Sequence, residues 1–434
     1  MKKIFYLLTM VVAVMTVSSC SNEQEDFFND SSANRANAEI KNTIDVLCSA
    51  SNGWIMQYFP GEPETWGGYN MLAKFDADGK VTVANEVSFA DYTETSYFSV
   101  KQSAGVMLSF DTYNNLFHVF SDPSAPLAGD QGSGMEGDYD FSVMSATKEK
   151  VVLKGRKRGT YLELTPMPTD ISWEDYLNKL TAVKNDMLSL KYTIDINGKQ
   201  LVASPTRRNR RTLKVSTTDE DGNAKTITIP YVFCTDGIET YMPVNVDGVE
   251  ITGFKYSADG TYEADNGSGV VLKQVAQPLN QLLIGYQWFC YFPDMGTYGQ
   301  IAWNYFHQGL NEIGDELIYG LIGTFNGRFG FHFASLASDG NAYNGGLNMD
   351  VTLIGDDKVS MQFNQSGYGS GAWYYQNAKM DFALYPFGHN KAKTFTITTD
   401  NPKMPSYLIL SDNDDSRNVI KLSYNVVYFP FLTE

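Results

Sequence analysis

The stretch Met71-Leu-Ala-Lys-Phe-Asp-Ala-Asp-Gly-Lys-Val-Thr-Val83 indicates the fold class of this chain. Two short runs rich in apolar residues flank the central Asp-Ala-Asp-Gly. An Asp-Gly turn between such runs is typical of a β-hairpin, because glycine accepts the positive φ that a tight hairpin turn needs. The stretch therefore predicts two antiparallel strands over residues 71–75 and 80–83.

Similar apolar runs continue beyond this hairpin. Further strands are expected at Tyr97–Val100, Val106–Asp111, Asn115–Phe120, Tyr139–Met144, Lys150–Gly155 and Thr160–Thr165. Strands separated by Gly and Asp turns at a regular spacing of about 8–12 residues are typical of an all-β meander, sandwich or barrel. The pattern does not separate a sandwich from a barrel.

The second half repeats this pattern, with hairpin turns at Asn197-Gly198 and Asp221-Gly222 and a last strand at Val419–Phe429. Helical periodicity is confined to a few segments, chiefly residues 34–50 and 172–188. We therefore expect a mainly β chain with a few helices, as meander, sandwich or barrel-like sheets in two halves joined by a helix. The expected domains are an N-terminal β-rich domain at 34–168 and a C-terminal β-rich domain at 169–434.

The first twenty residues form a different kind of segment. Lys2 and Lys3 precede the apolar run Ile4–Thr16, which is shorter than the roughly 20 residues that span a bilayer. Val17-Ser18-Ser19-Cys20 then resembles a bacterial lipobox. We expect residues 1–19 to be a signal peptide, Cys20 to carry the lipid, and residues 20–33 to be a polar tether. The alternative is an ordinary secreted protein with a chance cysteine at the cleavage site.

Composition limits the classes of function. Hydrophobic residues make up 43% of the 434 residues, which suffices for a packed core. The net charge of −17 disfavours nucleic acid as a partner. Cys48, Cys234 and Cys290 lie far apart without a Cys-x-x-Cys pair, so neither a disulfide framework nor a zinc site is expected.

Established catalytic signatures are missing from the sequence. It contains no Gly-x-Ser-x-Gly, no His-Glu-x-x-His, and no phosphate-binding or dinucleotide-binding glycine motif. His332 lies in Gly-Phe-His-Phe, where a hydrogen-bonded strand histidine is expected. No cofactor is predicted, and whether the chain is an enzyme stays open, with a binding protein favoured.

Acidic and basic clusters have ordinary explanations. Asp76-x-Asp78 and Asp412-Asn413-Asp414-Asp415 carry oxygen ligands that calcium prefers, but neither matches a complete calcium loop. Turn chemistry explains them, so no metal site is predicted. The basic residues Lys154, Arg156, Lys157 and Arg158, and the group Arg207, Arg208, Arg210 and Arg211, are expected in solvated turns; an anionic ligand is the alternative.

Aromatic residues give the positive signal, at 14% of the chain with 27 tyrosines. Most are expected in the core, but some lie in stretches rich in glycine and polar residues. The candidate ligand-binding residues are Trp66, Tyr69, Tyr298, Trp373 and Tyr374; Tyr368 and Tyr375 share the last stretch. Exposed ring faces beside amide groups suit a sugar ring or an extended peptide. The alternative is that these rings fold back to cap a core.

Several phrases together resemble a known family. They are Gly53-Trp54 with Tyr58, Gly67-Gly68-Tyr69-Asn70, Leu108–Asn114, His118–Pro123, Gly137–Phe141 and Leu153-Lys154-Gly155. They are similar to a family of Bacteroidota outer-membrane lipoproteins that carry a large domain of unknown function. The similarity is dense from about residue 35 to 165 and diffuse beyond.

The resemblance implies a lipid-anchored outer-membrane protein, exposed at the cell surface. It also implies as partners a paired outer-membrane transporter and lid lipoprotein that import nutrients. We therefore expect an accessory binding protein for a glycan or peptide, held at the membrane through lipidated Cys20. The alternatives are a hydrolase that uses carboxylates hidden among the 50 acidic residues, and a purely structural subunit of the transporter.

Overall fold

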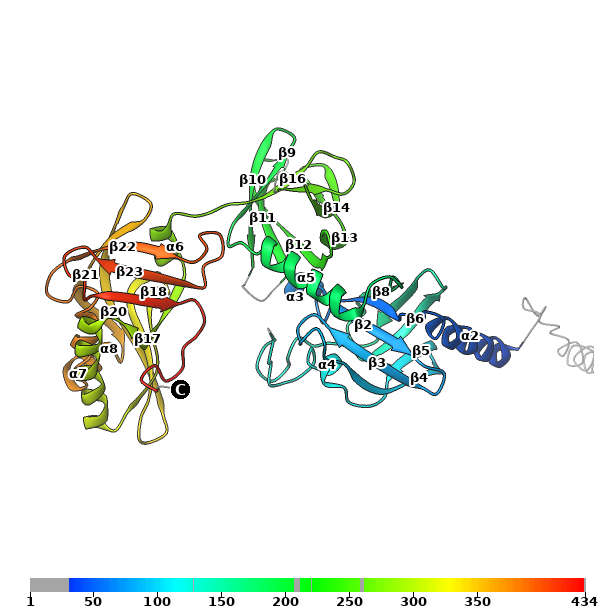
Figure 1. Cartoon of the computed structure of the whole chain (residues 1–434), viewed down its shortest axis with the longest axis horizontal. Coiled ribbons are helices and arrows are strands. Elements are labelled where there is room, and N and C mark those ends of the chain that lie inside the picture. Colours follow the sequence, from blue (N-terminus) through cyan, green and yellow to red (C-terminus); the bar gives the residue numbers. More distant parts are fainter. Residues whose placement is uncertain (1–30, 128, 207–210, 220, 258–260, 433–434) are drawn as a thin grey trace, which may run out of the picture. The chain divides into compact units, whose positions relative to one another are not determined.

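The structure is a computed structural model that describes residues 31–127, 129–206, 211–219, 221–257 and 261–432 (Figure 1). These residues form three closed barrels of eight antiparallel strands each, accompanied by a few helices. The prediction of a mainly β chain with a few helices is confirmed, and each sheet is a barrel. The predicted signal peptide, Cys20 and most of the tether lie outside the described residues; the end of the tether segment belongs to the first described helix.

The chain divides into two compact units. The first comprises Tyr69–Asp175 and the residues up to Glu62, and the second comprises Pro63–Gly68 and the residues from Tyr176 onward. The first barrel lies in the first unit, and the other two barrels lie in the second. The expected limits of independently folding domains, 34–168 and 169–434, stay a prediction.

The first barrel contains the hairpin with which the sequence analysis began. Its strands are β1 (Trp54–Tyr58), β2 (Tyr69–Phe75), β3 (Lys80–Asn85), β4 (Glu94–Ser103), β5 (Gly105–Phe110), β6 (Asp140–Ala146), β7 (Val151–Gly155) and β8 (Tyr161–Pro166). β8 pairs with β1 and closes the barrel. The predicted β2–β3 turn is confirmed, since Asp76 N donates to Lys80 O at 2.8 Å and Gly79 has a φ of +83°.

Two helices belong to this barrel. α2 (Ser32–Leu47) packs against β4, β5 and β6, and the Trp54 indole N–H donates to Leu47 O at 2.8 Å. α4 (Asn115–His118) lies where the sequence predicted a strand, and that prediction is wrong. The Asn114 side chain accepts hydrogen bonds from the Leu116 and Phe117 amides, so it caps a helical turn that alternation alone does not reveal.

The second barrel follows α5 (Trp173–Met187), which begins in the first unit and ends in the second. Its strands are β9 (Tyr192–Ile196), β10 (Lys199–Pro205), β11 (Thr212–Thr218), β12 (Ala224–Cys234), β13 (Gly237–Val246), β14 (Val249–Tyr256), β15 (Tyr262–Ala264) and β16 (Val271–Gln274). Asn197 and Gly198 both have positive φ, which confirms the predicted tight turn. The short helix α3 (Pro63–Trp66) packs on β11 and β12.

The third barrel has an extensive core, to which both its strands and its helices contribute. Its strands are β17 (Gln287–Met295), β18 (Glu316–Phe325), β19 (Arg328–Leu336), β20 (Ala342–Ile354), β21 (Lys358–Gly369), β22 (Lys393–Thr399), β23 (Tyr407–Asp412) and β24 (Val419–Ser423). The helices are α6 (Leu279–Gly285), α7 (Thr297–Ile313), α8 (Gly371–Asn377) and α9 (Asp381–Leu384) (Figure 1). Trp288, Trp303 and Phe331 are fully buried at the centre.

The last strand is shorter than the sequence predicted. β24 ends at Ser423, whose hydroxyl accepts from Asn425 N at 3.1 Å and turns the chain. The following residues, Tyr424–Leu432, form what we call the C-terminal segment. It is held against the barrel by hydrogen bonds from Phe292 N to Pro430 O, at 3.1 Å, and from Phe429 N to Ile318 O, at 2.7 Å.

Cys48, Cys234 and Cys290 are free thiols, which agrees with the expectation of no disulfide framework. Within the described ranges, no helix combines the length and the apolarity needed to cross a membrane.

Candidate functional site

A row of side chains crosses five neighbouring strands of the third barrel, on the face that points away from the core. In register from β17 to β21 the row is Phe289, Leu321, His332, Gly346 and Tyr368. Because successive side chains of a strand point to opposite faces, the adjacent residues enter the core; these are Trp288, Ile322, Phe331 and Leu347. This cross-strand row is the floor of a second apolar layer outside the barrel.

The row and the C-terminal segment enclose a cavity of about 320 Å³, which we call the third-barrel groove. From the row, Phe289, Leu321, His332 and Tyr368 line it. The other lining residues are Gln287, Tyr319, Phe325, Phe333, Asn344, Gly345, Val426 and Tyr428. Aromatic rings dominate the lining, two amide side chains supply donors and acceptors, and none of these residues carries a formal charge. Ligand sites have this character and volumes from about 300 to 1,000 Å³, so the groove suits one ring-sized group.

His332 fixes the polar end of the floor. Its Nε2 lies 3.0 Å from Gly323 O, and since a carbonyl can only accept, Nε2 carries the proton. Burial lowers the pKa of His332 and keeps the ring neutral, so Nδ1 accepts from the Tyr368 hydroxyl at 3.0 Å. The prediction of a hydrogen-bonded strand histidine is confirmed. The lone pairs of the Tyr368 oxygen remain able to accept from a ligand.

Gly346 makes this contact possible. It lies between His332 and Tyr368 in the row, and their side chains meet above it. A Cβ at this position would lie 2.5 Å from both His332 Nδ1 and the Tyr368 ring. The missing side chain therefore lets the His332 and Tyr368 rings approach each other.

One cation lies beside the groove without lining it. The Arg328 guanidinium lies over the ring of Tyr368, 5.1 Å from its centroid. This contact holds the Tyr368 ring from one side while His332 holds its hydroxyl. The groove therefore presents oriented rings beside two amide side chains.

Three predicted ligand-binding aromatics are buried, and for them the expectation of an exposed ring is wrong. Trp66 is 3% exposed in α3, because Arg211 N donates to Trp66 O at 3.0 Å and Gly68 N donates to Tyr231 O at 2.9 Å. Tyr69 packs on Phe120 with ring centroids 5.1 Å apart. Tyr374 is buried in α8, and its hydroxyl donates to Asp315. The alternative held for these three: they fill a core.

The other two lie nearer the surface. Trp373 is 52% exposed on α8, with its ring edge-on to Tyr374. Tyr298 is half-buried at the start of α7, and the Lys393 ammonium lies over its ring at 4.9 Å from the centroid. Neither residue lines the third-barrel groove. A role for either in ligand binding stays a prediction.

Sequence reasoning missed most of the groove residues. Phe289, Tyr319 and Phe325 lie in regular strands, where an aromatic is normally assigned to the core. A signal does exist: β18 reads Leu-Ile-Tyr-Gly-Leu-Ile over residues 317–322, which is apolar on both faces. A strand apolar on both faces must be covered on both, so this pattern indicates a second layer.

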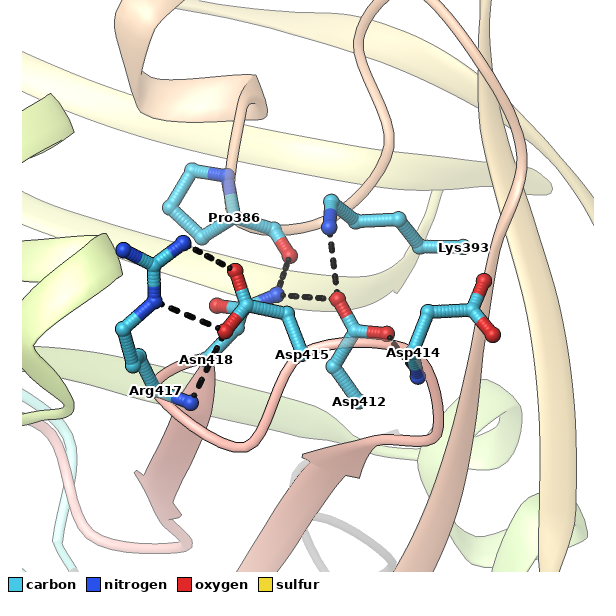
Figure 2. A network of polar contacts seen from close by, with 7 residues as sticks. All are labelled: Pro386, Lys393, Asp412, Asp414, Asp415, Arg417 and Asn418. Carbon is cyan, nitrogen blue, oxygen red and sulfur yellow. Dashed lines mark hydrogen bonds and ion pairs between the residues drawn. The ribbon is translucent and has the colours of Figure 1, made fainter.

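The acidic stretch at residues 412–415 is a closed polar network (Figure 2). Asp412 Oδ2 accepts from Lys393 Nζ at 2.5 Å and from Asn418 Nδ2 at 2.9 Å. Asp415 pairs with the Arg417 guanidinium through both carboxylate oxygens. The Asp412 and Asp415 carboxylates are thus each paired with a protein cation. The part of the chain that the structure describes contains no group of three or more metal-ligating side chains.

The carboxyl groups whose pKa is shifted are stabilised in their charged form. A glycosidase needs one carboxyl with a raised pKa as its general acid. Among the described residues, the carboxyl pKa shifts that are resolved all move down. For Asp412, burial favours the neutral form, but the hydrogen bonds from Asn418 and Lys393 outweigh it and lower the pKa. For Asp415, the Arg417 guanidinium lowers the pKa to about 2.

The basic clusters have protein partners where they are described. Arg211 is buried, and its guanidinium donates to Gly68 O at 2.8 Å. Arg158 pairs with Glu136, and Arg156 donates to the Ser103 hydroxyl at 2.6 Å. Residues 207–210 lie outside the described residues.

A family model described as "Domain of unknown function (DUF4302)" matches residues 24–258, which is more than half of the chain. The chain belongs to this family. The DUF4302 match covers the first barrel and reaches β14 of the second, so the third-barrel groove lies outside it. The family description assigns no activity.

No curated protein matches the chain. Two solved structures with long alignments are the beta subunit of a DNA polymerase from Streptococcus pyogenes and transferrin-binding protein B from Haemophilus parasuis. The alignment with the first is 10% identical, extends over 90% of this chain and 98% of the polymerase subunit, and has a TM-score of 0.12. The second is 9% identical, covers 86% and 74%, and has a TM-score of 0.13. TM-scores this low carry no argument about the DUF4302 protein.

Proposed function

We propose that this chain is a lipid-anchored surface protein that binds a glycan or a peptide and assists its import through an outer-membrane transporter. The observation that carries the binding part is the third-barrel groove. Its aromatic walls, its two amide side chains and the oriented Tyr368 hydroxyl suit one uncharged ring, such as a sugar residue or an aromatic peptide side chain. None of the described residues that line the groove is an Asp or Glu, which favours binding over carboxylate-based hydrolysis at this site.

The anchoring part rests on the sequence. A leader with Lys2 and Lys3, an apolar run and Val17-Ser18-Ser19-Cys20 supports acylation of Cys20. Each buried methylene contributes roughly 0.8 kcal/mol to membrane binding, so two or more acyl chains hold a protein stably. The transporter and lid lipoprotein enter as proposed partners through the family resemblance.

The binding site is tested by a screen of the chain after Cys20 against peptides and polysaccharides side by side. Tyr428→Ala removes an exposed ring from the groove wall, while Tyr256→Ala removes a similarly exposed ring from the second barrel. We expect Tyr428→Ala to weaken binding of the retained compound about 2- to 12-fold, from the value of one aromatic contact. Equal affinity of both variants and the unchanged chain would remove the groove from the proposal.

The anchor is tested separately. Cys20→Ala is expected to leave the protein unacylated and to move it out of the membrane fraction. Mass spectrometry of the mature protein measures the modification directly. A free thiol at Cys20 in the unchanged protein would end the proposal of a lipoprotein.

A further inference from the structure

Three rings lie in contact at the surface of the first barrel: Tyr113 stacks on His118, and Tyr139 is tilted against His118. The Tyr113 and His118 ring centroids are 4.9 Å apart with planes 24° apart, and those of His118 and Tyr139 are 5.5 Å apart with planes 34° apart. Tyr113 is 63% exposed and Tyr139 is 49% exposed. His118 covers one face of Tyr113, so most of that exposed area belongs to the opposite face.

The middle ring is fixed from below. His118 Nδ1 lies 3.1 Å from Asn114 N and 3.0 Å from Asn114 O. Asn114 is fully buried, and its side-chain amide donates to Glu94 O and to the Ser96 hydroxyl. The same side chain caps α4, so one buried residue sets both the helical turn and the position of the stack.

The loop that carries Tyr113 is fixed as well. Asp111 N donates to Tyr97 O at 2.9 Å, and the Thr112 hydroxyl accepts from Tyr97 N at 2.9 Å. Tyr113 therefore lies between a loop residue bonded to β4 and the buried Asn114. A tyrosine face held open by such a scaffold is pre-organised, which reduces the entropy lost when a ligand stacks on it.

Two carboxylates stand close to these tyrosines in the sequence: Asp111 precedes Tyr113 by two residues, and Asp140 follows Tyr139. Partial burial favours the neutral form of Asp111, but neighbouring hydroxyl groups and the Lys101 ammonium, 3.5 Å away, outweigh it and lower the pKa of Asp111. Asp140 accepts from the Ser109 hydroxyl at 2.6 Å. Charged carboxylates are strong acceptors for hydroxyl groups. They repel phosphate and acidic sugars.

We propose that the open face of Tyr113 is a binding site for a neutral, equatorially substituted pyranose ring of a glycan. Such a ring presents a flat face of C–H bonds to the aromatic face and hydroxyl groups at its edge. One open face without opposing walls suits a chain that lies across the surface, unlike the enclosed third-barrel groove. This site lies on a different barrel and does not depend on the proposed function of the groove.

The test uses residues 21–434 and cellohexaose, a neutral chain of β-linked glucose, with saturation-transfer NMR. We expect saturation to be strongest at the axial ring protons of one sugar face, which is the signature of stacking. Tyr113→Ala should weaken binding about 2- to 12-fold, the value of one stacked ring, whereas Tyr113→Phe should retain it. The matched control is Tyr256→Ala, an exposed tyrosine that contacts the Tyr262 ring edge-on.

Three results would overturn the proposal. Absence of saturation transfer to cellohexaose in the unchanged protein overturns the proposal, as does full binding by Tyr113→Ala. A lysine-rich peptide that binds at Tyr113 in place of cellohexaose also overturns it, because a cation would then be the ligand of the ring face. Melting temperatures of the variants equal to that of the unchanged protein show that a loss belongs to the site and not to the fold.

Discussion

Two tryptophans in stretches of similar composition occupy opposite environments. Trp66 lies in Glu-Thr-Trp-Gly-Gly-Tyr and is 3% exposed, whereas Trp373 lies in Gly-Ser-Gly-Ala-Trp-Tyr-Tyr and is 52% exposed. The backbone around Trp66 is bonded to Arg211 and Tyr231 of the second barrel, and this contact covers the ring. In α8 the neighbouring Tyr374 takes the buried position, which leaves Trp373 outside. Glycine-rich composition therefore predicts a turn, but the partner of that turn decides the exposure of its side chains.

The largest test of this comparison is Trp66→Ala. Truncation of a buried aromatic to alanine costs about 3–5 kcal/mol, because it removes contacts and leaves a cavity. We expect a loss of that size in the free energy that protects β11 and β12, measured by native-state hydrogen exchange. Unchanged protection there would show that the ring does not support the second barrel.

The same contrast occurs between neighbours in the acidic stretch. Asp412 has no exposed side-chain area and pairs with nearly buried Lys393, whereas Asp415 pairs with a largely exposed Arg417. Asp412→Ala leaves a buried ammonium without its counter-ion, so we expect the third barrel to lose about 3–5 kcal/mol in urea denaturation. Asp415→Ala is the matched control, with a much smaller expected loss because solvent screens its pair.

This pair also predicts a pH dependence. A carboxyl whose pKa falls on folding stabilises the fold above its unfolded pKa, and that contribution disappears as the pH falls through the folded pKa. The pKa of Asp412 is lowered from 3.8, so the contribution is complete above about pH 4 and shrinks below it. The difference in unfolding free energy between the unchanged protein and Asp412→Ala should narrow below pH 4. A constant difference would contradict the ion-pair explanation.

A smaller effect is expected at the floor of the third-barrel groove. Gly346→Ala places a methyl group 2.5 Å from His332 Nδ1 and from the Tyr368 ring. Overpacking of this kind costs about 1–3 kcal/mol and should break the hydrogen bond between the two side chains. NMR of the His332 ring reports that bond directly. The control is Gly285→Ala, because a Cβ at Gly285 meets no atom within 4 Å and this glycine does not have a positive φ. Gly340→Ala would not serve as a control, because Gly340 has a positive φ.

The sequence predicted the elements better than the site, for a physical reason. Turns such as Asp76–Gly79 and Asn197-Gly198 are local, because the Gly and Asn residues that adopt positive φ stand within the turn itself. Burial of Tyr69 against Phe120 depends on a partner about fifty positions away, which no local pattern identifies. The cross-strand row is harder still, because Phe289 and Tyr368 come to line one cavity only through the register of five strands.

The smallest expected effect on stability belongs to Trp373→Ala. Its ring is half exposed and touches Tyr374 edge-on, so truncation should change the unfolding free energy of the third barrel by no more than about 0.5 kcal/mol. Its effect on binding separates two positions for the ligand. If the compound found by screening binds in the third-barrel groove, Tyr428→Ala weakens binding and Trp373→Ala does not, because only Tyr428 lines that cavity. Weaker binding by Trp373→Ala alone would move the site from the groove to the exposed face of α8.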